Sequence, residues 1–215
     1  MQKNRVAVVG TYASIAVAVE TAVFAFSLVL GLATRSMVGP VIGYIACIFL
    51  AVSVVALMCS VYLHAAAELR VFGLLGLAAS ILYAPFCMGN YFLQLSVVLT
   101  NPLNHPPEVL KLIGFVPGST TFALDMLGYA LLCLATLAAA CTVADPRDRA
   151  LRLLCFVHGA LALPTIAAPI LSGLFRGVGG QSSDTGSYVL LFWCALFIPL
   201  AILFQRMFRR GSQRT

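Results

Sequence analysis

Residues 41–66 read VIGYIACIFLAVSVVALMCSVYLHAA, an apolar stretch that contains no Asp, Glu, Lys or Arg. A bilayer core is crossed by about 20 helical residues, because an α-helix rises about 1.5 Å per residue. Only a helix or a closed barrel satisfies every backbone group inside lipid. The stretch therefore predicts a transmembrane helix that starts after Gly39-Pro40 and ends before Glu68 and Arg70.

The same pattern recurs along the chain, and the linkers between the apolar runs carry almost every charge. Pro164 and Pro169 fall in the same run, where each removes a backbone hydrogen bond, so we expect that helix to be irregular. The whole chain is predicted to form one all-α membrane domain, a bundle of six transmembrane helices at residues 6–33, 41–66, 71–99, 120–143, 150–173 and 187–208.

The composition excludes a soluble domain. Hydrophobic residues make up 61% of the 215 residues and charged residues 9%, with a mean hydropathy of +1.02. Soluble domains carry roughly 25% charged residues. The net charge of +6 does not indicate nucleic-acid binding, because the basic residues sit at the ends of apolar runs without a basic stripe. Membrane lipids are the expected partners, with anionic headgroups as counterions of the arginines.

The distribution of basic residues predicts the orientation of the bundle. Lys and Arg concentrate in cytoplasmic segments of membrane proteins. With six spans and a cytoplasmic N-terminus, three basic residues lie outside, and both termini are cytoplasmic. The remaining ten of the thirteen lie inside, namely Lys3, Arg5, Arg70, Arg147, Arg149, Arg152, Arg206, Arg209, Arg210 and Arg214.

Two further patterns concern the first run and the cysteines. The first run is much longer than the roughly 7–15 apolar residues of a signal peptide, and Glu20 interrupts it, so we expect a retained helix. The seven cysteines all lie inside expected spans and form no C-x-x-C pair. This placement is typical of packing residues, and we expect neither a metal nor a cofactor.

The connection at residues 101–119, NPLNHPPEVLKLIGFVPGS, is rich in proline yet partly apolar. The residues between Pro107 and Pro117 favour a short interfacial helix that caps the outer end of the bundle. A loop that simply packs on the helix ends is an equal alternative.

Two carboxyl groups fall inside expected spans. An ionisable side chain at mid-membrane costs about 2.5–3.5 kcal/mol on insertion scales, so it normally faces the bundle interior and marks a candidate site. Glu20 lies near the middle of the first span, and Asp125 lies one to two turns inside the outer end of the fourth.

Further polar residues lie at similar depth. Asn90 and Gln94 are four residues apart and share a helix face. At 1.5 Å per residue, Asn90 and Asp125 both lie about 8–9 Å outward from the middle of their spans. Tyr129 follows Asp125 by one turn. We therefore predict a ligand-binding cluster of Glu20, Asn90, Gln94, Asp125 and Tyr129.

A purely structural role is the alternative for these residues, because interhelical hydrogen bonds in membranes also use such side chains, at about 0.6 kcal/mol each. His158, alone in the fifth span, is interpreted as a hydrogen-bonded packing residue. The small residues Gly10, Ser14 and Ala18, and the pair Gly73 and Gly76, suit close helix approach. That approach can occur within one chain or in a homo-oligomer, and both remain open.

YFLQLSVV at residues 91–98 and DMLGY at residues 125–129 are two short motifs in neighbouring spans. They resemble motifs of a group of uncharacterised prokaryotic membrane proteins, which pair a Y-x-x-Q-L-x-V-V helix with an acidic-x-L-G-Y helix. The basic stretch at 149–154 and the tail after Phe204 are also similar, so the likeness covers residues 90–210.

That resemblance implies a six-helix membrane fold in a prokaryotic plasma membrane, without an assigned activity. Glu is the residue expected in that group where this chain has Asp125. The likeness further implies that Gln94, Asp125 and Tyr129 act together.

The function expected from these patterns is binding or transport of a lipid-like or small apolar solute with one polar group. No H-E-x-x-H, G-x-S-x-G or phosphate-binding loop occurs. Two alternatives stay open. One is a membrane scaffold or assembly subunit, and the other is an intramembrane isomerase-like enzyme that uses one acid as a proton donor.

Overall fold

A computed structural model describes residues 2–100, 106–116, 118–174 and 183–212. Within these ranges the chain is helical, and six segments are long and apolar enough to cross a membrane. The elements run in the order α1 (Gln2–Thr34), α2 (Val38–His64), η1 (Ala67–Leu69), α3 (Arg70–Leu93), η2 (Gln94–Val98), α4 (Pro107–Ile113), α5 (Thr120–Thr142), η3 (Pro146–Asp148), α6 (Arg149–Ala160), α7 (Ala162–Leu174) and α8 (Ser183–Ser212).

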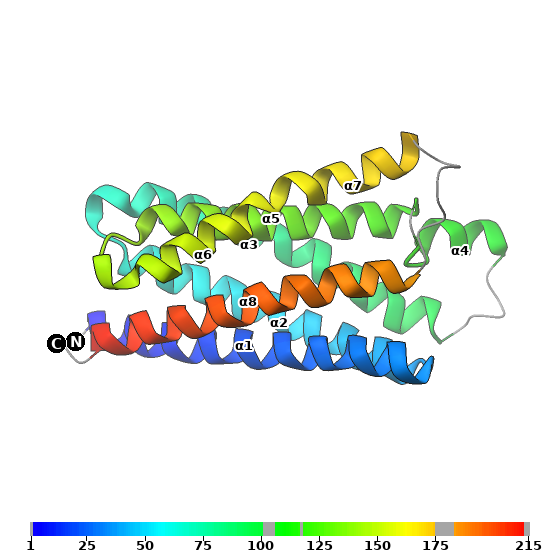
Figure 1. The fold of residues 1–215 in the computed structure, drawn as a ribbon, viewed down its shortest axis with the longest axis horizontal. Helices are drawn as coiled ribbons and strands as arrows, with labels where there is room; N and C mark the ends of the chain where they lie inside the picture. Colours follow the sequence, from blue (N-terminus) through cyan, green and yellow to red (C-terminus); the bar gives the residue numbers. More distant parts are fainter. Residues whose placement is uncertain (1, 101–105, 117, 175–182, 213–215) are drawn as a thin grey trace.

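The predicted all-α bundle of six spans is confirmed. The helices start and end within a few residues of the predicted spans, and some extend past the charged residues that flank the apolar runs, such as Arg5 in α1 and Arg206 in α8. Figure 1 shows the long helices lying roughly along one axis, with both chain ends at one end of the bundle and α4 at the other. A cytoplasmic location of the termini stays a prediction from the charge distribution.

α2 and α5 form the interior of the bundle. Of the 18 most apolar consecutive residues in each span, 50% are buried in α5 and 44% in α2, against 22–33% in the other four spans. α2 packs against α1 and α3, α5 packs against α3, α6 and α7, and α8 closes the arrangement against α1 and α6. Polar groups placed on the inner faces of α2, α3 and α5 are therefore shielded from lipid.

Small residues let the helices approach closely within one chain. A Cβ added to Gly10 of α1 would lie 2.7 Å from the ring of Phe208 of α8. A Cβ on Gly76 of α3 would lie 3.0 Å from the carbonyl oxygen of Ala135 of α5. Both predicted close-approach positions thus have intrachain partners, and a homo-oligomer stays a prediction.

The fifth span is irregular, as predicted, with a break next to Pro164, whereas Pro169 lies inside α7. α6 ends at Ala160 and α7 begins at Ala162. Pro164 has no N–H to donate to the carbonyl of Ala160, so the regular hydrogen-bond ladder cannot continue. The N–H of Leu161 instead donates to His158, three residues back, and Thr165 donates to Leu161 to start the next helix.

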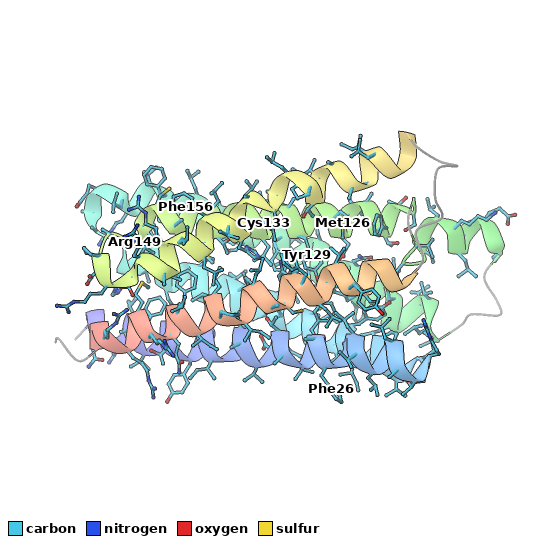
Figure 2. All side chains as sticks on the ribbon, in the orientation of Figure 1. Phe26, Met126, Tyr129, Cys133, Arg149 and Phe156 are labelled. Carbon is cyan, nitrogen blue, oxygen red and sulfur yellow. The ribbon has the colours of Figure 1, made fainter. Side chains whose placement is uncertain are left out.

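The outside of the bundle is apolar. Tyr12, Phe26, Leu163 and Tyr188 are all more than half exposed. Figure 2 shows the Phe26 side chain pointing away from α1, whereas Tyr129 lies inside the bundle. Large contiguous apolar surface is rare on soluble proteins. This surface fits contact with lipid chains.

Candidate functional site

Asp125 is the most deeply buried carboxyl group among the described residues of the spans, with 2% of its surface exposed. It lies in the second turn of α5, about 7.5 Å from the helix start at Thr120. Two local features fix that start. Gly118 has a φ of 90°, which a residue without a Cβ adopts readily, and the Ser119 hydroxyl accepts a bond of 3.0 Å from the N–H of Phe122.

Two tyrosine hydroxyls adjoin this carboxyl group. The hydroxyl of Tyr91, from α3, donates to Asp125 Oδ2 over 3.4 Å and lies 3.2 Å from the hydroxyl of Tyr129. Tyr129 is one turn below Asp125 on the same face of α5. The structure therefore joins α3 and α5 through a buried carboxyl–tyrosine–tyrosine chain.

Asn90 lies one residue before Tyr91 and borders the same centre. Its Nδ2 donates to the carbonyl oxygen of Thr121 over 3.1 Å, and its side chain lies beside the Asp125 carboxyl group. One oxygen on each of these side chains, Asn90 Oδ1 and Asp125 Oδ1, is buried without a hydrogen-bond partner in the described parts of the chain. Within the described residues, the centre thus contains two buried hydrogen-bond acceptors to which no group donates.

Aromatic rings surround the centre. Tyr44 of α2 stacks on Tyr91 with ring centroids 5.2 Å apart, and Phe115 lies 6.2 Å from the same ring. Trp193 of α8 meets Tyr129 edge to face at 5.2 Å. Three further segments of the chain, namely α2, the residues after α4 and α8, therefore pack against the tyrosines that α3 and α5 supply.

Gln94 shares a face with Asn90, but it contacts a different part of the chain. Its Nε2 donates to the carbonyl oxygen of Ile113 over 2.7 Å, and the Thr121 hydroxyl donates to Gly114 over 2.8 Å. These bonds hold the end of α4 against the bundle. The short helix predicted in this connection is present, at Pro107–Ile113, and the connection also packs on the helix ends.

The helix geometry changes at Gln94. Residues Gln94–Val98 form a π-helical turn, in which the N–H of Leu99 donates to the carbonyl oxygen of Gln94, five residues back. Such turns insert one extra residue into a helix and are frequent at functional sites. Here the turn follows α3 directly and begins three residues after Tyr91 of the Asp125 centre.

Glu20 has a partner of its own on another pair of helices. Its Oε1 accepts a bond of 3.0 Å from the hydroxyl of Ser53, which joins α1 to α2. Glu20 is half-buried, and its Oε2 is buried without a partner in the described residues. The recorded contacts of Asp125 are with Asn90 and Tyr91. The structure brings Asn90, Asp125 and Tyr129 together, and it gives Glu20 and Gln94 other partners.

Sequence reasoning overlooked three residues that border the centre. Tyr91 is the first residue of the motif YFLQ and directly follows Asn90. Its place next to an amide expected to be buried could have indicated that it belongs to the site. Tyr44 and Trp193 lie in long apolar runs, Trp193 directly after Phe192, and nothing in their spacing distinguishes them from lipid-facing aromatics.

The charge environment of Asp125 limits its chemistry. No basic side chain contacts it in the described ranges, and these ranges contain no group of three His, Cys, Asp or Glu able to hold a metal ion. An ionised carboxylate without a partner is very costly in an apolar interior. The centre is therefore suited to a protonated acid or to a bound hydrogen-bond donor.

No protein-family model, curated protein or solved structure matches the chain. The inference of function therefore depends on the geometry of the site.

Proposed function

We propose that this integral membrane protein binds, and carries across the membrane, a small and largely apolar solute with one hydrogen-bond-donating group. The observation that carries the proposal is the pair of buried acceptors without a donor, Asp125 Oδ1 and Asn90 Oδ1. Buried polar atoms in proteins nearly always have a partner. A donor on the solute supplies that partner.

The surroundings of the two acceptors narrow the class of solute. A carboxyl group enclosed by Tyr44, Tyr91 and Tyr129 suits an amine, because an ammonium group pairs with the carboxylate and is attracted to aromatic faces. The apolar remainder of the solute fits a site that is mostly aromatic and aliphatic, as small-molecule sites generally are. An apolar amine is thus the preferred ligand class.

The path to the site runs through the end of the bundle that carries α4. Phe115 packs against Tyr91, and Gln94 donates a hydrogen bond to the carbonyl oxygen of Ile113, two residues earlier. Exchange of a solute at this end requires the α4 connection to move away from Tyr91. The proposal places this end outside a prokaryotic plasma membrane and the arginine-rich end in the cytoplasm, in accordance with the positive-inside rule.

The test uses purified protein in detergent and two probes of equal chain length, octylamine and octanoate. The ammonium group of octylamine donates hydrogen bonds, so octylamine should raise the melting temperature of the parent protein. Ionised octanoate donates no hydrogen bond and should not raise it. Asp125→Asn removes the anionic acceptor and should weaken octylamine binding by about 10- to 100-fold, the equivalent of one charge-assisted hydrogen bond.

Glu20→Gln is the matched control, because it removes the other carboxyl group of the spans, whose recorded partner is Ser53. It should bind octylamine like the parent. Equal stabilisation of the parent and Asp125→Asn by octylamine would contradict the proposal. An absence of any ligand effect in the parent and in both variants would favour the scaffold. A changed product in lipid extracts of expressing cells would favour the isomerase-like enzyme.

A further inference from the structure

A pocket lies far from Asp125, at the end of the bundle where α1 starts and α8 ends. It has a volume of about 510 Å³ and lies between the last turns of α8 on one side and η3 with the start of α6 on the other. Asp148 is the acidic residue of its lining. The basic residues of the lining are Arg147, Arg206, Arg209 and Arg210. Four positive charges against one negative charge leave an excess of three.

The arginines are crowded onto adjacent positions. Arg206, Arg209 and Arg210 are three and four residues apart on α8, so they share one face of the helix. The Nε of Arg210 donates to the carbonyl oxygen of Arg206 over 3.3 Å. Like charges at this spacing destabilise a helix unless an anion lies between them. Arg206 and Arg209 have no acidic partner within the described residues.

Asp148 pairs with one arginine of this pocket, but its single negative charge does not neutralise the four arginines. It is buried, it pairs with the guanidinium of Arg210, and it directly precedes α6. Its side chain does not cap the helix. The start of α6, including Ala150 in the pocket lining, therefore adds the partial positive charge of a helix N-terminus. Guanidinium groups and a helix N-terminus are the usual partners of phosphate.

The pocket also has an apolar part. Leu151 of α6 and Leu203 of α8 belong to its lining. Leu203 is partly exposed, and Ile202 beside it on α8 is exposed as part of the outer apolar surface. A molecule with a phosphate and an attached hydrocarbon chain matches this combination, because the phosphate meets arginine while the chain meets lipid-facing surface.

We propose that this pocket binds the phosphate headgroup of an anionic membrane phospholipid. Basic pockets between transmembrane helices on the cytoplasmic side are suited to such headgroups. The site is separate from the Asp125 centre, and the proposal holds whether or not Asp125 binds a solute.

The test measures the melting temperature of the full-length protein in detergent with added phosphatidylglycerol, phosphatidylcholine or inorganic phosphate. Phosphatidylglycerol should stabilise the parent more than phosphatidylcholine does. In Arg206→Gln/Arg209→Gln the affinity for phosphatidylglycerol should fall about thirty-fold, on the basis of roughly 1 kcal/mol per basic residue at an anionic surface.

The control is Arg70→Gln/Arg152→Gln, which removes the same charge from two exposed arginines outside the pocket lining. It should keep the phosphatidylglycerol effect. An equal loss in both double variants would overturn the pocket in favour of general surface charge. Stabilisation by inorganic phosphate equal to that by phosphatidylglycerol would overturn the lipid as the source of the phosphate. Melting without added lipid, unchanged in both double variants, verifies that they fold.

Discussion

The Nδ1 atom of His158 lies 2.7 Å from the hydroxyl oxygen of Thr136, and this contact joins α6 to α5 in the interior of the bundle. The Thr136 hydroxyl also donates to the carbonyl oxygen of Cys133 over 2.8 Å. With that proton engaged, His158 donates through Nδ1 and its Nε2 is left as a buried acceptor. The rings of Phe197 and Trp193 enclose it at 5.0 and 5.8 Å. The contact agrees with a hydrogen-bonded packing role for His158.

Thr136→Val removes the hydroxyl at nearly constant volume and leaves His158 Nδ1 unsatisfied. We expect it to lower the free energy of unfolding by about 1–3 kcal/mol, the cost of an unpaired buried polar group. Thr136→Ser keeps the hydroxyl and should retain most of the stability. Reversible unfolding in mixed micelles measures both variants, and an equal loss in the two would contradict the role of the hydrogen bond.

Gly159→Ala tests the close approach of α6 to α5. The new Cβ would lie 2.6 Å from the Cβ and 2.9 Å from the Cα of Leu137, and a backbone atom cannot turn away as a side chain can. Overpacking of this kind costs about 1–3 kcal/mol. Gly89→Ala on α3 is the control, because no atom lies within 4 Å of its added Cβ. Thermal melting should show a loss for Gly159→Ala alone.

Glu20→Gln should change the stability very little. The amide oxygen can still accept the bond from the Ser53 hydroxyl, and an interhelical hydrogen bond of this type is worth about 0.6 kcal/mol. Ser53→Ala should cost a similar amount. A loss several times larger in the same unfolding measurement would show that the ionised carboxylate itself supports the packing of α1 on α2.

The orientation can be tested with one cysteine introduced at each of two exposed connections, in a background in which the seven native cysteines are replaced by alanine. Ser36 lies between α1 and α2, and Ala144 lies between α5 and η3, at opposite ends of the bundle. In intact cells, a membrane-impermeant maleimide should label Ser36→Cys but not Ala144→Cys, and it should label both after permeabilisation. Labelling of only Ala144→Cys in intact cells would reverse the orientation.

The spans were predictable from the sequence because lipid admits only helices and closed barrels, and apolar runs of about 20 residues or more have the length of a helix rather than of a barrel strand. Pro164 was also informative, since it lacks the N–H that would donate to the carbonyl of Ala160 where α6 ends, although Pro169 lies inside α7 without ending it. Both features are local, and their physical causes lie within a few residues of the chain.

The partners of the polar residues were much less predictable. Counting residues gives the depth of Glu20 and Asp125, but it does not say which helices are neighbours. That is why the contact of Glu20 with Ser53 was not foreseen. Helical periodicity placed Asn90 and Gln94 on one face, yet the longer glutamine reaches the end of α4 while Asn90 stays beside Asp125.

The packing of Phe208 on Gly10 means that the first helix of this protein to be made packs against the last. The ribosome releases α1 first and α8 last, so the partner of Gly10 does not exist until the other spans have entered the membrane. Until then one face of α1 is covered only by lipid or by the insertion machinery. A nascent chain that stalls before α8 therefore has one face of α1 without its partner helix. The bundle is complete only when α8 packs on that face.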